Sequence, residues 1–148
     1  MTQLQAIRIF TSSVLQQNII ISRQKMSDNW GMNVLSRNPR LSIPSNLNYK
    51  PVNEDIQFYN DFISRYHDAK YFKEITLVLL HECGHWMTKE NIDWADDIIR
   101  RESAHTMYHY MRIPSEWQAT EWAINWLKNK QHRILARQFE KNFFGKGE

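Results

Sequence analysis

The stretch TLVLLHECGHWMTKE, from Thr76 to Glu90, decides how this sequence is interpreted. His81 and His85 lie four positions apart in it, so on a helix both side chains project from one face and can converge on a single cation. Glu82 flanks that face and can reach a water molecule held by the metal without being a ligand itself. The stretch therefore predicts a helix that carries two metal ligands and a general base.

The residues around the histidines favour a buried helix. The apolar run from Leu77 to Leu80 precedes them and would place the preceding turn in the core, which suits the rigid, dry support that a catalytic zinc site needs. Gly84 costs about 1 kcal/mol relative to alanine inside a helix, so it indicates that a crossing helix or strand approaches the backbone there. Cys83 is expected to point off the ligand face and to be a packed thiol.

A third protein ligand has to come from elsewhere in the chain, because catalytic zinc commonly takes three protein ligands and a water. Glu116 is the first choice. It lies thirty-one positions after His85, which leaves room for one intervening helix, and the start of the helix that it begins favours an ionised carboxylate. Glu121 is the alternative carboxylate. Zinc is the predicted metal, and another divalent cation stays open.

A second pair of histidines, His105 and His109, has the same spacing. No glutamate follows His105, and core-like methionines share the segment, so a structural or half-exposed role is predicted for the pair. Hydrolysis would also require a hydrogen-bond donor for the oxyanion that develops on the substrate. The sequence does not discriminate among the candidates His105, Tyr108, His109, Tyr110 and Arg112.

The rest of the chain predicts a small sheet followed by helices. A helix through Leu4 to Leu15 precedes two or three short strands within residues 19–50, where apolar residues alternate between turn residues. Beyond Pro51 the apolar residues recur at helical spacing. Helices are expected to start near Pro51, to cover about 71–89, to run from Asn91 or Asp93 through Met111, to restart near Glu116 with Ser115 as N-cap, and to cover 131–144 before Gly145.

Composition and charge limit the class of protein. The 148 residues, 42% hydrophobic and 24% charged, predict one folded domain over residues 1–148. The net charge of +3 is concentrated toward the C-terminus at helical intervals, which predicts a solvated helix face and argues against direct nucleic-acid binding. The single cysteine suits a reducing compartment, and neither an export signal nor a membrane-spanning run is recognised. A cytoplasmic protein is expected.

The segments HECGHW and EWQATEWA together resemble the ImmA/IrrE family of zinc metallopeptidases, over about a third of the chain. Helices of that family carry HExxH and a later Glu-x-x-Ala-Asn/Asp-x-aromatic-Ala pattern. Carried over by position, the resemblance implies His81 and His85 as zinc ligands, Glu116 as the third ligand, and Glu82 as the general base. Thr120 departs from the pattern, since it offers only a hydroxyl where Asn or Asp would hold a ligand histidine.

The resemblance also implies an architecture and an activity. The expected fold is a compact zincin-like α+β domain, mostly helical, with a small N-terminal sheet packed beside the active-site helix. The expected activity is hydrolysis of a peptide bond in a protein substrate, such as a repressor or another regulator of a mobile genetic element. The alternative is a non-catalytic zinc-binding protein that acts through a partner. Glu82 beside an open ligand set favours the enzyme, because structural zinc sites usually close all four positions with Cys or His.

Overall fold

The computed structural model describes residues 1–24, 29–47 and 53–145, with the backbone alone for residues 53–55. Helix α1 (Gln3–Leu15) and the strands β1 (Ile20–Arg23), β2 (Gly31–Asn33) and β3 (Arg40–Ile43) come first. The helices α2 (Asn53–Arg65), α3 (Glu74–Thr88), α4 (Trp94–Ser103), α5 (Met107–Tyr110), α6 (Pro114–Leu127) and α7 (Lys130–Phe144) follow, with 3-10 turns η1 (His67–Tyr71) and η2 (Lys89–Asn91) before and after α3. The predicted α+β class, mostly helical with a small N-terminal sheet, is confirmed.

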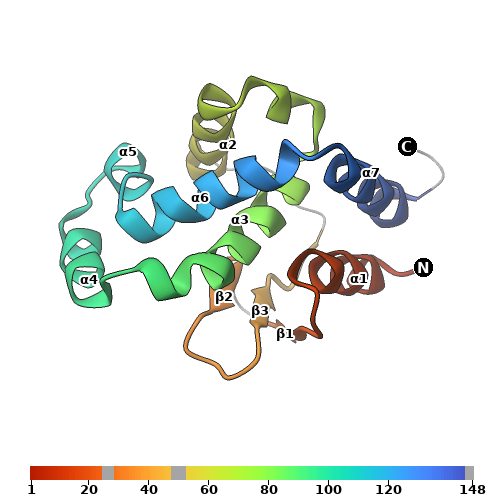
Figure 1. The fold of residues 1–148 in the computed structure, drawn as a ribbon, viewed down its shortest axis with the longest axis horizontal. Coiled ribbons are helices and arrows are strands. Elements are labelled where there is room, and N and C mark those ends of the chain that lie inside the picture. The colour runs from red at the N-terminus through yellow and green to blue at the C-terminus, as the bar shows by residue number, and fades with distance from the viewer. Residues whose placement is uncertain (25–28, 48–52, 146–148) are drawn as a thin grey trace.

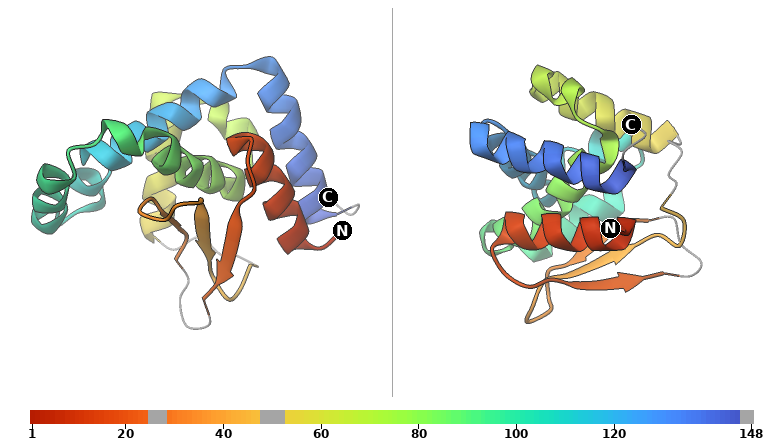
Figure 2. Two further views of the ribbon diagram at one scale, coloured as in Figure 1. Left: turned by 60° about the horizontal axis from the view of Figure 1, so that its bottom comes forward. Right: turned by 90° about the vertical axis from the view of Figure 1, so that its right-hand side faces the viewer.

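The sheet has the strand order β1-β3-β2, with β1 parallel and β2 antiparallel to β3. The register sets Ile21 and Met32 on either side of Leu41, so the three side chains share one face. Leu41 is fully buried, whereas Arg40 donates a hydrogen bond of 3.1 Å to Ser22 on the other face. Such alternation is typical of a sheet with one face in the core, and Figure 2 shows α1 lying over that face.

The main core lies between the sheet, α1, α3 and the C-terminal helices. The ring of Phe10 on α1 stacks on Phe139 of α7 at 4.6 Å and meets Trp126 of α6 edge-on at 5.9 Å. In Figure 1, α1 and α7 lie at one end of the molecule with both termini, while α4 and α5 lie at the other end. The apolar core is therefore concentrated toward the end of the molecule that holds α1, α7 and both termini. The contacts at the end that holds α4 and α5 are smaller.

Helices α3 and α6 run side by side through the centre of the fold (Figure 1). A Cβ atom at Gly84 would collide with the carbonyl oxygen of Ala119 and would lie 2.9 Å from its Cα atom. This contact confirms the prediction that another element approaches the backbone at Gly84. Ala119 and Ala123 are fully buried, and their small side chains allow the two helices to pack closely.

The start of α3 is capped by a side chain from the far end of the chain. Lys73 occupies the N-cap position without a side-chain cap of its own. A carboxylate oxygen of Glu140 on α7 accepts the Lys73 backbone N–H at 2.7 Å and the Thr76 hydroxyl at 2.6 Å. A buried carboxylate is favourable at a helix N-terminus because the helix dipole is positive there.

The single helix predicted from Asn91 or Asp93 to Met111 is wrong. The chain leaves the helix after Ser103, where Ala104 has extended backbone angles. The Thr106 side chain then accepts the backbone N–H of His109 at 3.2 Å and starts the short helix α5. A capping threonine therefore overrides the continuous helical spacing of the apolar residues.

The predicted N-cap role of Ser115 is also wrong. Helix α6 begins at Pro114, with Ile113 as an N-cap that makes no side-chain hydrogen bond. Proline is favoured at a first helical position because it has no N–H to leave unpaired. The Ser115 hydroxyl instead donates to Asp97 on α4 at 2.8 Å, and its backbone N–H donates to the same carboxylate at 2.9 Å.

Helices α1, α3 and α7 begin and end near their predicted positions. Helix α1 and helix α7 are confirmed, and Gly145 ends α7 with a φ of 80°. The predicted helix start at Pro51 lies outside the described residues. Basic side chains on α7, such as Arg137 and Lys141, are exposed while Phe139 is buried, which is the burial pattern of a solvated helix face. No described helix has the length and apolar character needed to cross a bilayer.

We predict that Gly84→Ala destabilises the protein by about 1–3 kcal/mol, the usual cost of inserting atoms into a packed contact. The added methyl group would push α6 away from α3, and this cost exceeds the gain in helix propensity. Urea unfolding measures the change. Gly31→Ala is the matched control, because a Cβ atom there meets no atom within 4 Å. Equal or greater stability of Gly84→Ala would contradict the close helix contact.

Candidate metal centre

Three donor atoms converge between α3 and α6. One carboxylate oxygen of Glu116 lies 3.0 Å from His81 Nε2 and 3.2 Å from His85 Nε2. The ligand atoms of these three residues all lie within 4.8 Å of one another, and the group is largely buried. Two imidazole nitrogens and one carboxylate oxygen at such separations could hold a metal ion. The structure thus gathers the three residues that the sequence proposed as ligands.

The second nitrogen of His81 is held in place by Thr120. The hydroxyl of Thr120 lies 2.9 Å from His81 Nδ1, and both side chains are buried. The ring of Phe58 on α2 packs edge-on against the same imidazole at 5.1 Å. A partner on the other ring nitrogen orients a ligand histidine and selects its tautomer. Thr120 therefore holds His81 through a hydroxyl, at the position where the pattern that this chain resembles has Asn or Asp.

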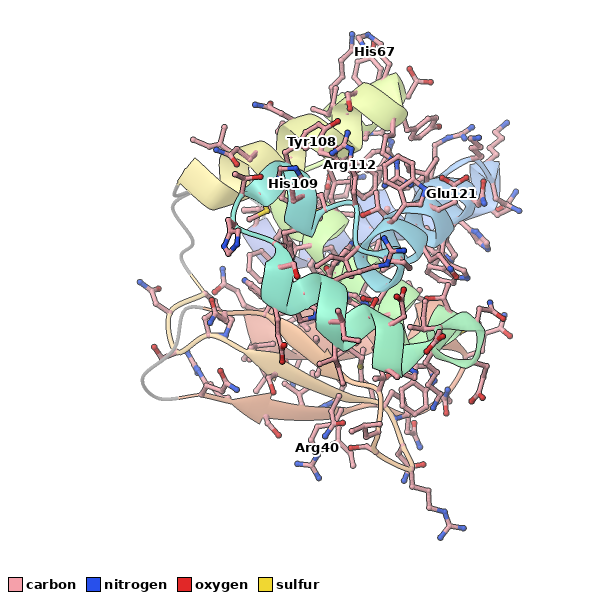
Figure 3. All side chains as sticks on the ribbon, turned by 90° about the vertical axis from the view of Figure 1, so that its left-hand side faces the viewer. Arg40, His67, Tyr108, His109, Arg112 and Glu121 are labelled. Atoms are coloured by element: carbon pink, nitrogen blue, oxygen red, sulfur yellow. The ribbon has the colours of Figure 1, made fainter. Side chains whose placement is uncertain are left out.

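The alternative carboxylate, Glu121, lies away from this group. Its side chain is 55% exposed and forms an ion pair of 2.9 Å with Arg65 of α2. Figure 3 shows Glu121 on the outer side of α6. Five positions along a helix leave two side chains about 140° apart around its axis. Glu116 and Glu121 therefore face different neighbours. Of the two candidates, Glu116 is the carboxylate that joins the histidines.

Glu82 lies beside the three donors without joining them. It is buried, and one carboxylate oxygen accepts the backbone N–H of Met32 on the edge strand β2 at 3.1 Å. Burial raises the pKa of Glu82, and the nearby charge of Glu116 raises it further, against the opposing effects of both histidines and of the Met32 N–H. A carboxyl group with a raised pKa suits the exchange of protons with a reacting group.

Charge and burial shift the pKa of Glu116 in opposite directions, and the same is true of His85. Burial would raise the pKa of Glu116, but hydrogen bonds with His81 and His85 hold it well below its usual range. Burial would lower the pKa of His85, but the hydrogen bond and charge of Glu116 raise it above the ordinary value. The metal-free group therefore favours an ionised carboxylate beside a protonated imidazole. A bound cation would displace that proton, because ligand histidines must be neutral.

A cavity of about 630 Å³ adjoins the donors. Its size lies within the roughly 300–1,000 Å³ typical of ligand sites. Its polar lining includes Glu82, His81 and Glu116, and its apolar lining includes Phe58, Val78 and Met111. Two of the three donor residues, His81 and Glu116, therefore line the cavity together with Glu82.

The structure separates the candidate oxyanion donors into two groups. His105 and Tyr110 line the cavity, whereas Tyr108 and Arg112 line a neighbouring cavity of about 550 Å³. His109 is exposed and lines neither of these two cavities; Figure 3 places Tyr108, His109 and Arg112 together on and beside α5. Burial raises the pKa of Tyr110 to about 12, so its hydroxyl keeps its proton and can donate it to a hydrogen bond.

Sequence reasoning missed a polar network behind Glu116. A guanidinium nitrogen of Arg101 on α4 lies 2.9 Å from the second carboxylate oxygen of Glu116 and 2.9 Å from the Ser115 hydroxyl. The same guanidinium contacts Asp97 at 3.4 Å and the Tyr110 hydroxyl at 3.1 Å. The only local signal is the spacing of Asp97 and Arg101, which is usual for an ordinary helix-surface ion pair.

Comparison of the chain with models of protein families, with curated proteins and with solved structures found no match. The candidate metal centre therefore rests on the geometry of this chain. The family resemblance stays a prediction from the motifs that carry it.

We predict that Glu116→Gln lowers zinc affinity by more than the roughly 10- to 100-fold typical for the loss of an outer hydrogen-bond partner. The amide removes the negative charge that faces both histidines. Competition with a chromogenic chelator measures the affinity. Glu121→Gln is the control and is expected to bind zinc as the wild type does. A larger loss in Glu121→Gln than in Glu116→Gln would reverse the assignment.

We predict that Thr120→Val lowers zinc affinity by about 10- to 100-fold, because His81 loses the hydroxyl that orients its ring. Valine has nearly the shape of threonine, so packing changes little. Thr120→Ser keeps the hydroxyl and is expected to retain most of the affinity. The same chelator competition compares the three proteins, and equal affinities for valine and threonine would show that the hydroxyl does not support the ligand.

Proposed function

We propose that this protein is a zinc-dependent metallopeptidase that hydrolyses a peptide bond in a protein substrate. The observation that carries the proposal is the convergence of His81, His85 and Glu116 beside a cavity, with the buried carboxylate of Glu82 next to them. The same four residues fit the HExxH and glutamate positions of the ImmA/IrrE pattern. Membership of that family, with its zincin-like fold, is part of the proposal.

The donor set supports zinc and supports catalysis over a structural role. Two imidazoles and a carboxylate are a usual set for catalytic zinc, whose fourth position holds water or substrate. Structural zinc sites usually take four Cys or His ligands. Cys83 is buried on α3 and does not belong to the donor group. A three-residue site that opens onto a cavity therefore favours the enzyme over a closed zinc site that only supports the fold.

The chain's own groups can carry the proton transfers of peptide hydrolysis. When bound, zinc would supply a polarised water whose pKa is lowered toward about 7. Glu82 accepts the proton of the attacking water and then delivers it to the leaving amine. The Met32 N–H holds one oxygen of Glu82, which leaves the other oxygen to meet the water. Tyr110 and His105 line the cavity and are the donors that we assign to the developing oxyanion.

The cavity supports a peptide as substrate. Its wall combines apolar side chains with polar ones such as Gln57 and Thr106, a lining that suits a peptide backbone with an apolar side chain. A repressor or another regulator of a mobile genetic element is the proposed protein substrate, on the resemblance alone. The cytoplasm is the proposed compartment, because the one thiol, Cys83, is free and buried, which suits reducing conditions.

We predict that Glu82→Gln abolishes peptide hydrolysis, lowering its rate by at least about 100-fold, while zinc binding is retained. Glutamine keeps the shape of the side chain but cannot take up the water's proton. The assay mixes zinc-loaded protein with a peptide library and with repressor proteins encoded beside its gene, and mass spectrometry detects cleaved bonds.

The assay has one control variant and two outcomes that would contradict the proposal. Glu121→Gln, on the outer side of α6, is expected to cleave as the wild type does. If Glu82→Gln cleaves at the wild-type rate, the proposed base is wrong. If the wild type binds zinc and one of the repressors but cleaves nothing, the non-catalytic alternative replaces the enzyme.

A further inference from the structure

We propose that Arg101 is a positioning residue that holds one carboxylate oxygen of Glu116, so that only the other oxygen faces the metal. The inference rests on the metal site of the proposed function and does not depend on peptide hydrolysis. Arg101 comes from α4, outside both motif segments, and no sequence pattern assigns it to the site.

The two oxygens of Glu116 have separate partners. The first, Oε1, lies 3.0 Å from His81 Nε2 and 3.2 Å from His85 Nε2. The second, Oε2, lies 2.9 Å from Arg101 Nη2. Because the Glu116 side chain is only 6% exposed, water has little access to compete for either oxygen. The carboxylate is thus fixed in rotation about its last bond, with one edge toward the histidines and the other toward the guanidinium.

The guanidinium is itself fixed from several sides. Its Nη2 atom also lies 2.9 Å from the Ser115 hydroxyl and 3.4 Å from Asp97 Oδ2. Asp97 is 1% exposed and is held by both the hydroxyl and the backbone N–H of Ser115. The Nη1 atom lies 3.1 Å from the Tyr110 hydroxyl. An arginine that is held at both terminal nitrogens, Nη1 and Nη2, has little freedom to follow a rotating carboxylate. The carboxylate therefore keeps its orientation.

An ordinary surface ion pair on the same helix provides the comparison. Arg100, the preceding residue, pairs with Asp96 at 2.6 Å, and both side chains are about half exposed, at 59% and 47%. Pairs of that kind contribute little, because water competes for both partners. Arg101 differs in that its partners Asp97 and Glu116 are buried. We therefore expect Arg101 to fix the orientation of the Glu116 carboxylate, in addition to joining α4 to α6.

The orientation matters for the number of ligands that the cation receives. A free carboxylate can bind with one oxygen or with both, and the second mode fills a position that a catalytic site needs for water. With Oε2 held by Arg101, Glu116 offers one oxygen. Three protein donors would then leave the fourth position of a bound cation to water or substrate.

The test uses the full chain with the variants Arg101→Leu and Arg101→Lys, and Arg100→Leu as the matched control. Zinc affinity is measured by competition with a chelator. Cobalt(II) is then used as a probe, since its visible absorption is strong in four-coordinate sites and weakens when the coordination number rises. Thermal unfolding of the metal-free proteins reports whether each variant folds.

Arg101→Leu is expected to lose about 10- to 100-fold in zinc affinity and to give a weaker cobalt absorption, whereas Arg100→Leu matches the wild type. Arg101→Lys keeps the charge without the two-nitrogen fork, so its affinity and spectrum should lie between the two. If Arg101→Leu does not fold, Arg101→Lys decides, and values equal to the wild type overturn the proposal.

The outcomes separate this proposal from the proposed function. If the wild type binds neither zinc nor cobalt, the metal site and the role of Arg101 both fail. If the wild type binds metal and Arg101→Leu has the same affinity and spectrum, only the role of Arg101 fails. If the variants behave as expected and no peptide is cleaved, the positioning role stands and the peptidase activity fails.

Discussion

The contact between Gly84 of α3 and Ala119 of α6 is the constraint on which the rest of the structure depends. Because Gly84 has no side chain, the α3 backbone meets the carbonyl group of Ala119 directly. Helix axes normally lie about 8–10 Å apart, depending on the side chains between them, and small residues reduce the separation. At this close approach the side chains of His81 and Glu116 meet at 3.0 Å across the helix pair. A backbone contact thereby determines the geometry of the polar group.

The same close contact creates a problem of buried charge. Glu116 is 4% exposed, and an isolated carboxylate in that position would lose several kcal/mol of hydration. Two imidazoles and one guanidinium surround it, and Thr120 and Asp97 in turn hold His81 and Arg101. Buried charges are tolerated when their hydrogen bonds are satisfied. The polar centre is thus compensated as a group, and removal of one member affects the partners that remain.

The parts of this arrangement that could be predicted from sequence are those with local signals. The spacing of His81 and His85 and the glycine between them predicted a helix, two histidines that converge and a close neighbour, and the structure contains all three. That the two histidines bind a metal stays a prediction. The continuous helix predicted through Met111 failed because Thr106 starts a new helix within an otherwise helical pattern.

The partners that are distant in sequence could not be predicted in this way. Arg101 and Met32 contact Glu116 and Glu82 only because the chain returns from elsewhere, across 15 and 50 positions. Nothing in a one-dimensional pattern distinguishes Arg101 from its neighbour Arg100. Ser115 fitted a capping pattern, but Asp97 takes its hydroxyl, and that competition is visible only in three dimensions.

The division of the core has a consequence for how the molecule opens. Within the continuously described range 53–145, the main apolar cluster has no buried member between Trp86 and Ala123, the segment that contains α4 and α5. Helices α4 and α5 are joined to the rest of the molecule by the polar contacts around Glu116 and by the buried side chains of Met111 and Ile113, which lie outside that cluster. A cation bound by His85 and Glu116 would close a loop around this segment and act as a cross-link that reduces the entropy gained when the segment detaches. Loss of the cation would then loosen α4 and α5 first, while the core formed by α1, α3 and α7 stays folded.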